Sequence, residues 1–320
     1  MKVLANDGIS AEGKAKLESA GFTVITDKVE QADLAREVNE QDIEVVLVRS
    51  ATTVRKEVID ACPNLKLIGR GGVGMDNIDV AYAREKGIKV INTPASSSQS
   101  VAELVMGMMF AGARSLHHSF KNMETGDFSA LKKRYGKGIE LRGKTLVIVG
   151  FGRIGQSLAS YALGCGMKVI GVGKSADSVN IPLEIAGHGK IDVKVDVVAD
   201  LNSVLPQADF ISLHVPKQAG GGAVITADSI AKMKNGVVII NAARGGVIDE
   251  SALLDAVSSG KVFFAGLDVF ENEPNPRKDL LNHEAIGTTP HIGAATVEAQ
   301  DRIGLELADL IIAEFGKQIA

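Results

Sequence analysis

Short apolar runs rich in Val, Ile and Leu alternate with helical patterns along almost the whole chain. Continuous apolar runs of this length are typical of strands that are covered on both faces of a sheet, and the helical segments between them supply the crossover connections. The pattern therefore predicts an α/β protein with two doubly wound parallel-sheet domains. The predicted strands are residues 3–5, 45–48, 65–68, 90–91, 146–149, 169–172, 210–215, 237–240 and 263–270.

The strand pattern breaks at residues 92–98, where Asn-Thr-Pro-Ala-Ser-Ser-Ser has the chemistry of a turn and a linker. A long helical stretch follows at about 100–120, then a basic segment at 132–137, and a new series of strands begins at Leu146. The last segment, about 296–320, has the pattern of one amphipathic helix. The break predicts a domain boundary near residue 98.

Composition narrows the class of protein. At 320 residues the chain is long enough for about two domains, and 45% hydrophobic with 23% charged residues is a globular mixture. The net charge of −4 argues against a nucleic-acid partner, and the apolar stretch at 104–113 is shorter than the ~20 residues of a membrane span. Cys62 and Cys165 lie far apart, which predicts free thiols in the cytoplasm and no metal site.

A dinucleotide-binding motif follows the predicted strand 146–149. Gly150, Gly152 and Gly155 match G-x-G-x-x-G before a helical segment, which predicts a tight turn, a close approach of the pyrophosphate and close packing of helix on strand. The same pattern occurs at 69–74, so the motif alone is weak. Because several further strands follow only the second copy, we interpret 150–155 as the dinucleotide site and 69–74 as a loop whose amides face an anionic ligand.

The acidic residue that usually binds the cofactor ribose is missing. A site selective for NAD has Asp or Glu about 20 residues after the motif, at the end of the second strand. Here Gly173, Lys174 and Ser175 follow the strand at 169–172. Lys174 and Ser175 can attract the 2′-phosphate of NADP, or the turn can be merely solvated while NAD binds through its other contacts. Both interpretations stay open.

Three ionisable residues follow predicted strands near the C-terminus. Arg244 follows 237–240, Glu271 and Glu273 follow 263–270, and His291 follows the segment 286–290. Because the carboxyl ends of parallel strands meet at one edge of a sheet, these side chains are expected in one crevice. Taken one at a time, each residue has a simpler interpretation. Arg244 can form a surface ion pair, Glu273 can be an acidic residue in a turn, and His291 can be a histidine at the end of a strand.

The charges of these residues suggest roles in alcohol–ketone redox chemistry. Arg244 can hold a substrate carboxylate in a bidentate pair and polarise the neighbouring oxygen. His291 can take the proton of the C2 hydroxyl, or return it in reduction. Glu273 can bind the imidazole, fix its tautomer and favour its protonated form.

The motifs together resemble those of the D-isomer-specific 2-hydroxyacid dehydrogenases, and the resemblance covers nearly the whole chain. It implies a flavodoxin-like substrate domain at 1–98, completed by the C-terminal helix at 292–320, and a Rossmann cofactor domain at 99–291. It also implies a homodimer. The motifs are RSAT at 49–52, GRGGVGMDNID at 69–79, NTP at 92–94, VGFGRIG at 149–155, NAARGG at 241–246, LDVFENEP at 267–274 and PHIG at 290–293.

The resemblance also implies roles for individual residues. It makes Arg244, Glu273 and His291 the catalytic set. Loop ion pairing is an alternative role for Arg49 and Arg70. The implied substrate contacts are Arg49, Ser50, Arg70, Val73 and Gly74, with Lys133 as a further candidate for a phosphate. The implied cofactor contacts are Val73, Gly150, Gly152, Arg153, Ile154, Gly155, Lys174, Val215, Pro216, Ala242, Asp268 and Gly293.

We therefore expect hydride transfer between NAD, or NADP, and a D-2-hydroxy acid. Within the family, the motifs most resemble those of members that oxidise 3-phosphoglycerate to 3-phosphohydroxypyruvate in serine biosynthesis. One alternative is an NADPH-dependent reductase of hydroxypyruvate or glyoxylate, and another is a binding protein that senses dinucleotides. No C-terminal regulatory domain follows the motifs, so feedback through such a domain is not expected.

Overall fold

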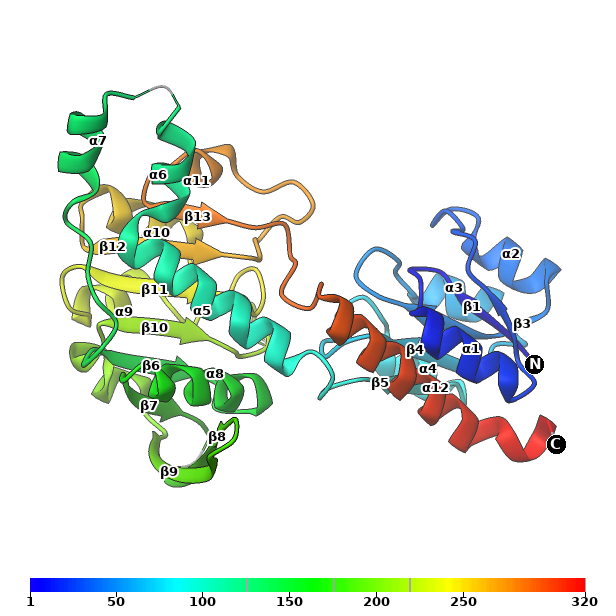
Figure 1. The fold of residues 1–320 in the computed structure, drawn as a ribbon. Helices are drawn as coiled ribbons and strands as arrows, with labels where there is room; N and C mark the ends of the chain where they lie inside the picture. Colours follow the sequence, from blue (N-terminus) through cyan, green and yellow to red (C-terminus); the bar gives the residue numbers. More distant parts are fainter. Residues whose placement is uncertain (125, 175, 219, 320) are drawn as a thin grey trace. The chain divides into compact units, whose positions relative to one another are not determined.

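The computed structural model describes residues 1–124, 126–174, 176–218 and 220–319, with side chains through residue 316. The chain forms two compact units (Figure 1). Unit 1 contains Met1–Ser98 and the chain from Ala294 onward, and unit 2 contains Gln99–Gly293. Each unit is built on its own sheet, so each is described by itself.

The sheet of unit 1 has five parallel strands in the order β2-β1-β3-β4-β5. This is the flavodoxin-like order, in which the direction of winding reverses between β1 and β3. The strands are β1 (Lys2–Ala5), β2 (Thr23–Ile25), β3 (Ile43–Val48), β4 (Leu67–Arg70) and β5 (Lys89–Asn92). The helices are α1 (Ala11–Ser19), α2 (Leu34–Glu40), α3 (Lys56–Ala61), α4 (Val80–Glu85) and α12 (Val297–Ile319).

Both faces of this sheet are buried. Val3 on one face packs in a core with Leu17 of α1 and Leu307 of α12, whereas Leu4 on the other face packs with residues of α2, α3 and α4. Successive strand residues point to opposite faces, so a strand that is covered twice is apolar at every position. This explains the unbroken apolar runs in the sequence.

The C-terminal helix packs closely on α1. A Cβ added to Gly13 of α1 would lie 2.6 Å from backbone atoms of Gly304 of α12, so the two helices approach each other at glycines. Ser10 caps α1 by accepting the N–H of Gly13. The sequence thus ties residues from both ends of the chain into one unit.

The sheet of unit 2 has eight strands in the order β13-β12-β11-β10-β6-β7-β9-β8. The strands are β6 (Thr145–Val149), β7 (Lys168–Val172), β8 (Asp177–Ile185), β9 (Gly189–Val198), β10 (Phe210–Leu213), β11 (Val237–Asn241), β12 (Val262–Leu267) and β13 (Ile286–Thr288). The helices are α5 (Ser98–Arg114), α6 (Leu116–Asn122), α7 (Phe128–Tyr135), α8 (Arg153–Gly164), α9 (Ala227–Lys232), α10 (Glu250–Ser258) and α11 (Lys278–Leu281), with 3₁₀ turns at Leu201–Ser203 and Leu205–Gln207.

The α/β prediction with two doubly wound sheets is confirmed, although the predicted strands omitted the short β2 and the pair β8 and β9. Strands β8 and β9 form an antiparallel hairpin at the edge of the second sheet, where β9 continues the parallel order beside β7. Alternate residues of the hairpin are apolar, and Ile181 and Val195 are buried. This alternation is the ordinary signal of a strand with one covered face, and the strand list above omitted it.

The predicted helix at 100–120 is also divided. Helix α5 ends at Arg114, Ser115 takes a left-handed conformation with φ 52°, and α6 begins at Leu116.

Within the described residues, no helix combines the length and the apolar character that crossing a membrane requires.

Candidate active site

The carboxyl ends of β11, β12 and β13 lie side by side in unit 2. Asn241 is paired with Leu267, and Leu267 with Thr288, so the loops that follow the three strands leave the same edge of the sheet. These loops carry Arg244, Glu273 and His291. The topology therefore brings the three predicted loops together.

Glu273 and His291 are in direct contact. The Oε2 atom of Glu273 lies 2.8 Å from Nδ1 of His291, and Oε1 accepts the N–H of Phe270 at 2.9 Å. Burial alone would raise the pKa of Glu273, but the hydrogen bonds from His291 and Phe270 and the charges of His291 and Arg244 bring this pKa below its usual value. Glu273 is therefore an anion beside the imidazole.

Arg244 belongs to the same cluster, because its charge contributes to the lowered pKa of Glu273. The Asn241 side chain holds the start of this loop: its Nδ2 donates to the carbonyl of Arg244 at 3.0 Å, and its Oδ1 accepts the N–H of Ala243 at 3.0 Å. The Arg244 guanidinium donates to the carbonyl of Ala243 at 2.6 Å. The charge of the Arg244 guanidinium thus acts on the carboxylate that binds the imidazole of His291.

The segment that carries His291 is fixed by Asp268, which follows β12 and is 1% exposed. Its carboxylate accepts the hydroxyl of Thr289 at 2.6 Å and the N–H groups of Ile292 and Gly293, each at 2.8 Å. These bonds surround His291, whose φ is 55°. Left-handed conformations are uncommon for residues other than glycine, so the surrounding bonds must hold this one in place.

The glycine motif at 150–155 forms a strand–turn–helix. Gly150 has φ 95°, and a Cβ there would lie 2.4 Å from the carbonyl oxygen of His214. A Cβ on Gly155 would lie 2.5 Å from the carbonyl oxygen of Gly150, whereas the space around Gly152 is open within 4 Å. Gly152 precedes the twelve-residue α8 in an extended conformation, and the open space around it lies at the N-terminus of this helix. This geometry fits a pyrophosphate.

His214 lies next to this turn. Its backbone N–H donates to the carbonyl of Val149 at 2.7 Å, and its Nε2 lies 2.8 Å from the hydroxyl of the buried Ser212. Nδ1 is buried and has no hydrogen-bond partner within the described parts of the chain. Burial lowers the pKa of His214 to about 4, so the ring is neutral near pH 7.

The copy of the motif at 69–74 has a different structure. Strand β4 ends at Arg70 and the chain continues as a loop, with α4 starting only at Val80. The N–H of Gly72 donates to the hydroxyl of Thr93 at 2.7 Å, and the Arg70 guanidinium lies over Gly72 and 3.3 Å from the hydroxyl of Ser50. Arg70 of this segment thus contacts Ser50 of the segment 49–52, and both are predicted substrate residues.

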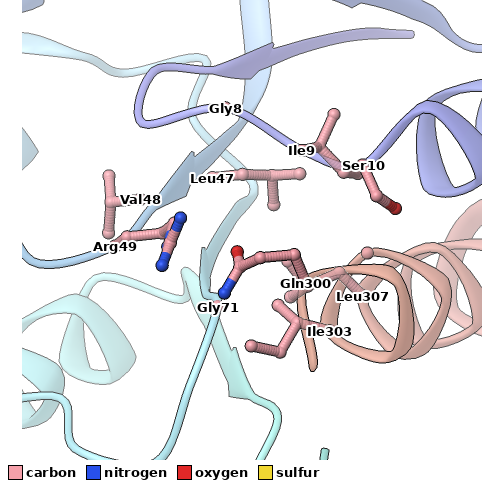
Figure 2. A pocket seen from close by; sticks show the side chains of 11 residues that line it. Gly8, Ile9, Ser10, Leu47, Val48, Arg49, Gly71, Gln300, Ile303 and Leu307 are labelled. Atoms are coloured by element: carbon pink, nitrogen blue, oxygen red, sulfur yellow. The ribbon is translucent and has the colours of Figure 1, made fainter. Parts of the chain in front are cut away.

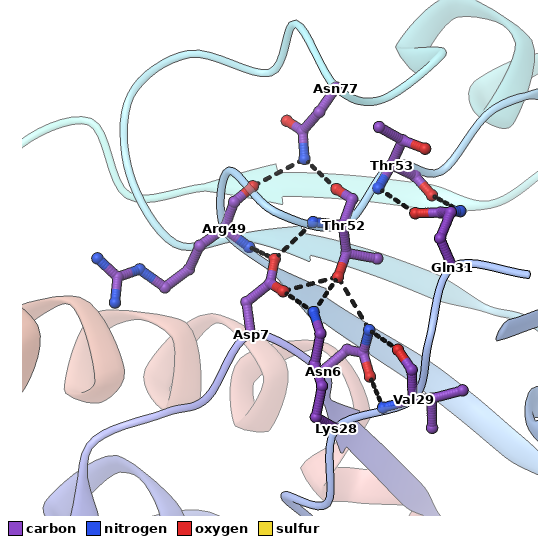
Figure 3. Close-up of polar contacts among 9 residues, drawn as sticks. All are labelled: Asn6, Asp7, Lys28, Val29, Gln31, Arg49, Thr52, Thr53 and Asn77. Atoms are coloured by element: carbon purple, nitrogen blue, oxygen red, sulfur yellow. Dashed lines mark hydrogen bonds and ion pairs between the residues drawn. The ribbon is translucent and has the colours of Figure 1, made fainter. Parts of the chain in front are cut away.

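The second predicted substrate segment, 49–52, is held from two sides (Figure 3). Asp7 accepts the N–H of Arg49 at 2.7 Å, the N–H of Thr52 at 3.0 Å and the hydroxyl of Thr52 at 2.7 Å. Asn77 donates to the carbonyls of Arg49 and Thr52 at 2.7 and 2.6 Å. Lys28 also pairs with Asp7 at 2.5 Å. The segment is therefore a fixed loop at the carboxyl end of β3.

A pocket lies at the carboxyl ends of β1, β3 and β4 in unit 1 (Figure 2). Leu47, Ile303 and Leu307 give it an apolar lining, and Arg49 and Gln300 add polar side chains. Burial lowers the pKa of Arg49, while the charge of Asp7 opposes this shift. In flavodoxin-like sheets, the crevice between the first and third strands is the usual place for a ligand.

The comparison with known proteins decides the family. Residues 106–293, more than half of the chain, match the profile described as "D-isomer specific 2-hydroxyacid dehydrogenase, NAD binding domain". The chain belongs to the D-isomer specific 2-hydroxyacid dehydrogenase family. It is an NAD(P)-dependent oxidoreductase of D-2-hydroxy acids.

Three relatives illustrate the similarity. The chain is 44% identical to hydroxypyruvate reductase of Thermotoga maritima over 319 residues, which cover 98% of both chains. It is 42% identical to D-3-phosphoglycerate dehydrogenase of Methanocaldococcus jannaschii over 97% of this chain and 57% of that one, so it spans little more than half of that protein. A solved glyoxylate reductase from Paecilomyes thermophila has TM-score 0.82 and 30% identity, over 98% of this chain and 95% of that chain.

Most predicted site residues of this dehydrogenase fall in two groups. Unit 2 contains the catalytic set and the predicted cofactor contacts Gly150, Gly152, Arg153, Ile154, Gly155, Lys174, Val215, Pro216, Ala242, Asp268 and Gly293. Unit 1 contains Arg49, Ser50, Arg70, Val73 and Gly74, so Val73 is separate in sequence and unit from the other cofactor candidates. Lys133 is exposed on α7 of unit 2, and Ser175 lies outside the described residues.

Some residues that shape the site were missed at the level of sequence. Asp7, Asn77 and Glu250 hold site loops in place, and Asp268 was assigned only to the cofactor. Asp7 comes two residues after the end of β1, and Asp268 comes directly after β12. A polar residue just beyond a buried strand was therefore the signal, although it did not show which loop the side chain would hold.

Proposed function

We propose that Arg244, Glu273 and His291 carry out the proton transfer and substrate binding of D-2-hydroxyacid oxidation and its reversal. The observation that carries this proposal is the contact between Glu273 Oε2 and His291 Nδ1, 2.8 Å long, next to the charge of Arg244. A bound nicotinamide supplies hydride acceptance and donation. The chain's own residues supply the proton, the charge and the orientation.

The hydrogen bonds assign the individual roles. An ionised carboxylate only accepts hydrogen bonds, so Glu273 requires the proton on Nδ1 of His291 and leaves Nε2 for exchange with the C2 oxygen. Nε2 takes the hydroxyl proton in oxidation and returns it in reduction. Arg244 pairs with the substrate carboxylate and draws negative charge toward the C2 oxygen.

We infer that unit 2 binds the dinucleotide and that unit 1 supplies the substrate-recognition residues. The open space at Gly152 and the close packing at Gly150 and Gly155 support the pyrophosphate site. Val215 and Pro216 follow β10, and Ala242 follows β11, at the same edge of the sheet. Gly173 and Lys174 follow β7 without a carboxylate, which favours acceptance of NADP beside NAD.

Within this class, the proposed substrate is 3-phosphoglycerate, with 3-phosphohydroxypyruvate as its oxidised form. Arg49, Arg70 and Lys133 are the candidates for the phosphate, and phosphoglycerate dehydrogenases are among the relatives. The second candidate is NADPH-dependent reduction of hydroxypyruvate or glyoxylate. It is favoured by the full-length similarity to a hydroxypyruvate reductase and by Lys174 beside Gly173, where no acid follows β7.

A matrix of substrates and cofactors tests both candidates. Initial rates are measured with NADH and NADPH against phosphohydroxypyruvate, hydroxypyruvate, glyoxylate and pyruvate, for wild type and for R49A and R70A. The phosphoglycerate proposal expects kcat/KM to fall far more for phosphohydroxypyruvate than for glyoxylate in both variants. Equal losses on both substrates would favour the second candidate. Absence of turnover with every pair, together with dinucleotide binding, would favour a sensing protein.

We also propose that the protein is a homodimer. Phe110 on α5, Phe120 on α6 and Phe128 on α7 are 42%, 74% and 67% exposed, and Met123 between them is 51% exposed. Large apolar side chains exposed on consecutive helices are expected where these helices contact a partner. Light scattering after size exclusion measures the mass, and F110E is expected to yield monomers.

We propose a cytoplasmic location, and a place in serine biosynthesis if phosphoglycerate is the substrate. Both cysteines, Cys62 and Cys165, are free thiols, as is usual in a reducing compartment.

A further inference from the structure

Glu250 is a buried carboxyl group that the proposed reaction does not use. It is the first residue of α10 and only 4% exposed. Burial is the main cause of its raised pKa, and the nearby charged groups are Glu271, Arg277 and Asp279. Its Oε2 atom is buried and has no hydrogen-bond partner in the described residues. A buried acid is costly, so its place in the structure needs an explanation.

The other oxygen of Glu250 makes a specific contact. Oε1 accepts the backbone N–H of Glu271 at 2.7 Å, and the N–H of Glu250 points back at Oε1 of Glu271 at 3.4 Å. Glu271 follows Phe270, whose own N–H is bound by Glu273 at 2.9 Å. The side chain of Glu250 thus fixes one end of the short segment whose other end carries Glu273.

Helix capping does not account for Glu250. Asp249 already caps α10, because its Oδ1 accepts the N–H groups of Ser251 and Ala252, each at 3.0 Å. The Glu250 carboxyl instead turns away from the helix and reaches across to residue 271. Its bond therefore connects two loops rather than completing a helix end.

The two loops that Glu250 connects are also in close backbone contact. A Cβ added to Gly245 would lie 1.7 Å from the carbonyl oxygen of Phe270 and 2.8 Å from the nitrogen of Glu271. Gly245 follows Arg244 directly. The loop that carries Arg244 thus packs on the segment that leads to Glu273, and Glu250 closes the same loop at residue 250.

We propose that Glu250 is a positioning residue, whose carboxyl oxygen holds segment 270–273 against the Arg244 loop and thereby keeps Glu273 on Nδ1 of His291. This inference rests on the proposed function, since it gives the Glu273–His291 pair its support. It adds a residue with no contact to the reacting groups. The acceptor oxygen, and not the negative charge, is the property that the site uses.

Two variants with side chains of similar shape distinguish the effect of the hydrogen-bond acceptor from the effect of packing at residue 250. E250Q keeps an oxygen that can accept the N–H of Glu271, whereas E250M fills the same space without an acceptor. We expect E250Q to keep most of the wild-type kcat, and E250M to lose about 10- to 100-fold in kcat, as a displaced catalytic pair does. KM for the dinucleotide should stay near wild type in both. S251A, which changes the neighbouring residue and its contact with Arg277, is the control and should behave as wild type.

The pH profile distinguishes positioning from a general loss of packing. The hydrogen bond from His291 helps to lower the pKa of Glu273, so a Glu273 that loses this bond takes up a proton at higher pH, and the acidic limb of the kcat profile should move to higher pH in E250M and stay in place in E250Q. A profile in E250M that coincides with wild type, at unchanged kcat, would overturn the proposal. Equal losses in E250Q and E250M would overturn it as well, because the acceptor would then not matter.

A crystal structure of E250M without cofactor provides a readout that needs no activity. The proposal expects Glu273 Oε2 to move away from its 2.8 Å contact with His291 Nδ1. An intact contact refutes the positioning role. If E250M does not fold, the same measurements on E250D, which shortens the side chain by one methylene, decide the question. Lack of turnover in the wild type would refute the proposed function but not the role of Glu250. The Glu273–His291 distance in the E250M crystal structure would still test that role.

Discussion

Glu273 holds His291 with one carboxylate oxygen and its own backbone segment with the other. The distances are 2.8 Å from Oε2 to Nδ1 of His291 and 2.9 Å from Oε1 to the nitrogen of Phe270. Because both oxygens are bound, the carboxylate cannot turn without losing a hydrogen bond to a charged group, worth about 1.5–3 kcal/mol. The imidazole is thereby fixed in one tautomer, and the bond to Glu273 uses Nδ1, which leaves Nε2 for the proposed proton exchange.

Replacement of His291 tests this arrangement. H291A should lower kcat by about 10²–10⁴-fold, since it removes the group that exchanges the proton. Dinucleotide affinity, measured by fluorescence titration, should stay near the wild-type value because the glycine turn at 150–155 is untouched. E273Q should lower kcat less than H291A, since a carboxamide still contacts the ring. Wild-type turnover in H291A would remove the histidine from the mechanism.

Asp268 should matter for both stability and turnover. Its carboxylate accepts three hydrogen bonds from residues 289, 292 and 293, in a nearly fully buried position. D268A leaves those donors unpaired and should lower the free energy of unfolding of unit 2 by about 3 kcal/mol, measured by urea titration. It should also lower kcat, because the left-handed His291 is no longer held.

T289V provides the graded comparison for Asp268. It removes one of the three donors and should cost about 1 kcal/mol. If D268A and T289V had the same free energy of unfolding, the bonds to Ile292 and Gly293 would not stabilise the fold, and the stabilising role of Asp268 would be wrong.

The strands around the site were predictable because burial on both faces leaves a local trace in the sequence. The apolar runs before Arg244 and Glu273 correspond to β11 and β12, and the parallel order of these strands brings their loops to one edge. The β8–β9 hairpin was missed because its apolar residues alternate with polar ones, as in a strand with one covered face, whereas the predicted strands were continuous apolar runs covered on both faces.

The residues that hold the site were less predictable because their bonds are long-range. Asp7 binds residues more than 40 positions away, and Asp268 binds a loop about 25 positions away. No local periodicity records such a bond. A lone acid after a strand is equally compatible with a solvated turn, so only the folded chain shows that these carboxylates hold backbone N–H groups.

The lowered pKa of His214, which lies beside the dinucleotide turn, predicts that the free energy of unfolding depends on pH. Its pKa is lowered by burial from 6.5 to about 4, so the folded state resists protonation while the unfolded chain does not. The free energy of unfolding should therefore keep the full contribution of the neutral His214 above pH 6.5. It should decline by up to about 3 kcal/mol as the pH falls from about 6.5 to 4.

Urea unfolding across this pH range measures the effect in wild type and in H214Q. The glutamine has no proton to gain, so the decline between pH 6.5 and 4 should be smaller in H214Q. H188Q is the matched control, since His188 is exposed at the turn of the β8–β9 hairpin and should leave the decline unchanged. The account fails if H214Q and wild type lose the same stability over this interval.

Lys174 should decide the preference between the two dinucleotides. It is exposed two residues after the end of β7, in the turn where a carboxylate would bind the ribose hydroxyls of NAD and repel a 2′-phosphate. K174D introduces such a carboxylate. The ratio of kcat/KM for NADPH to that for NADH should then fall by about 10- to 100-fold, the value of one charge-assisted contact of 1.5–3 kcal/mol. K168D makes the same charge change at the opposite, amino end of β7 and should leave the ratio unaltered. Because both variants change the net charge equally, an equal effect on the ratio would mean that long-range electrostatics, and not a contact at the ribose, sets the preference.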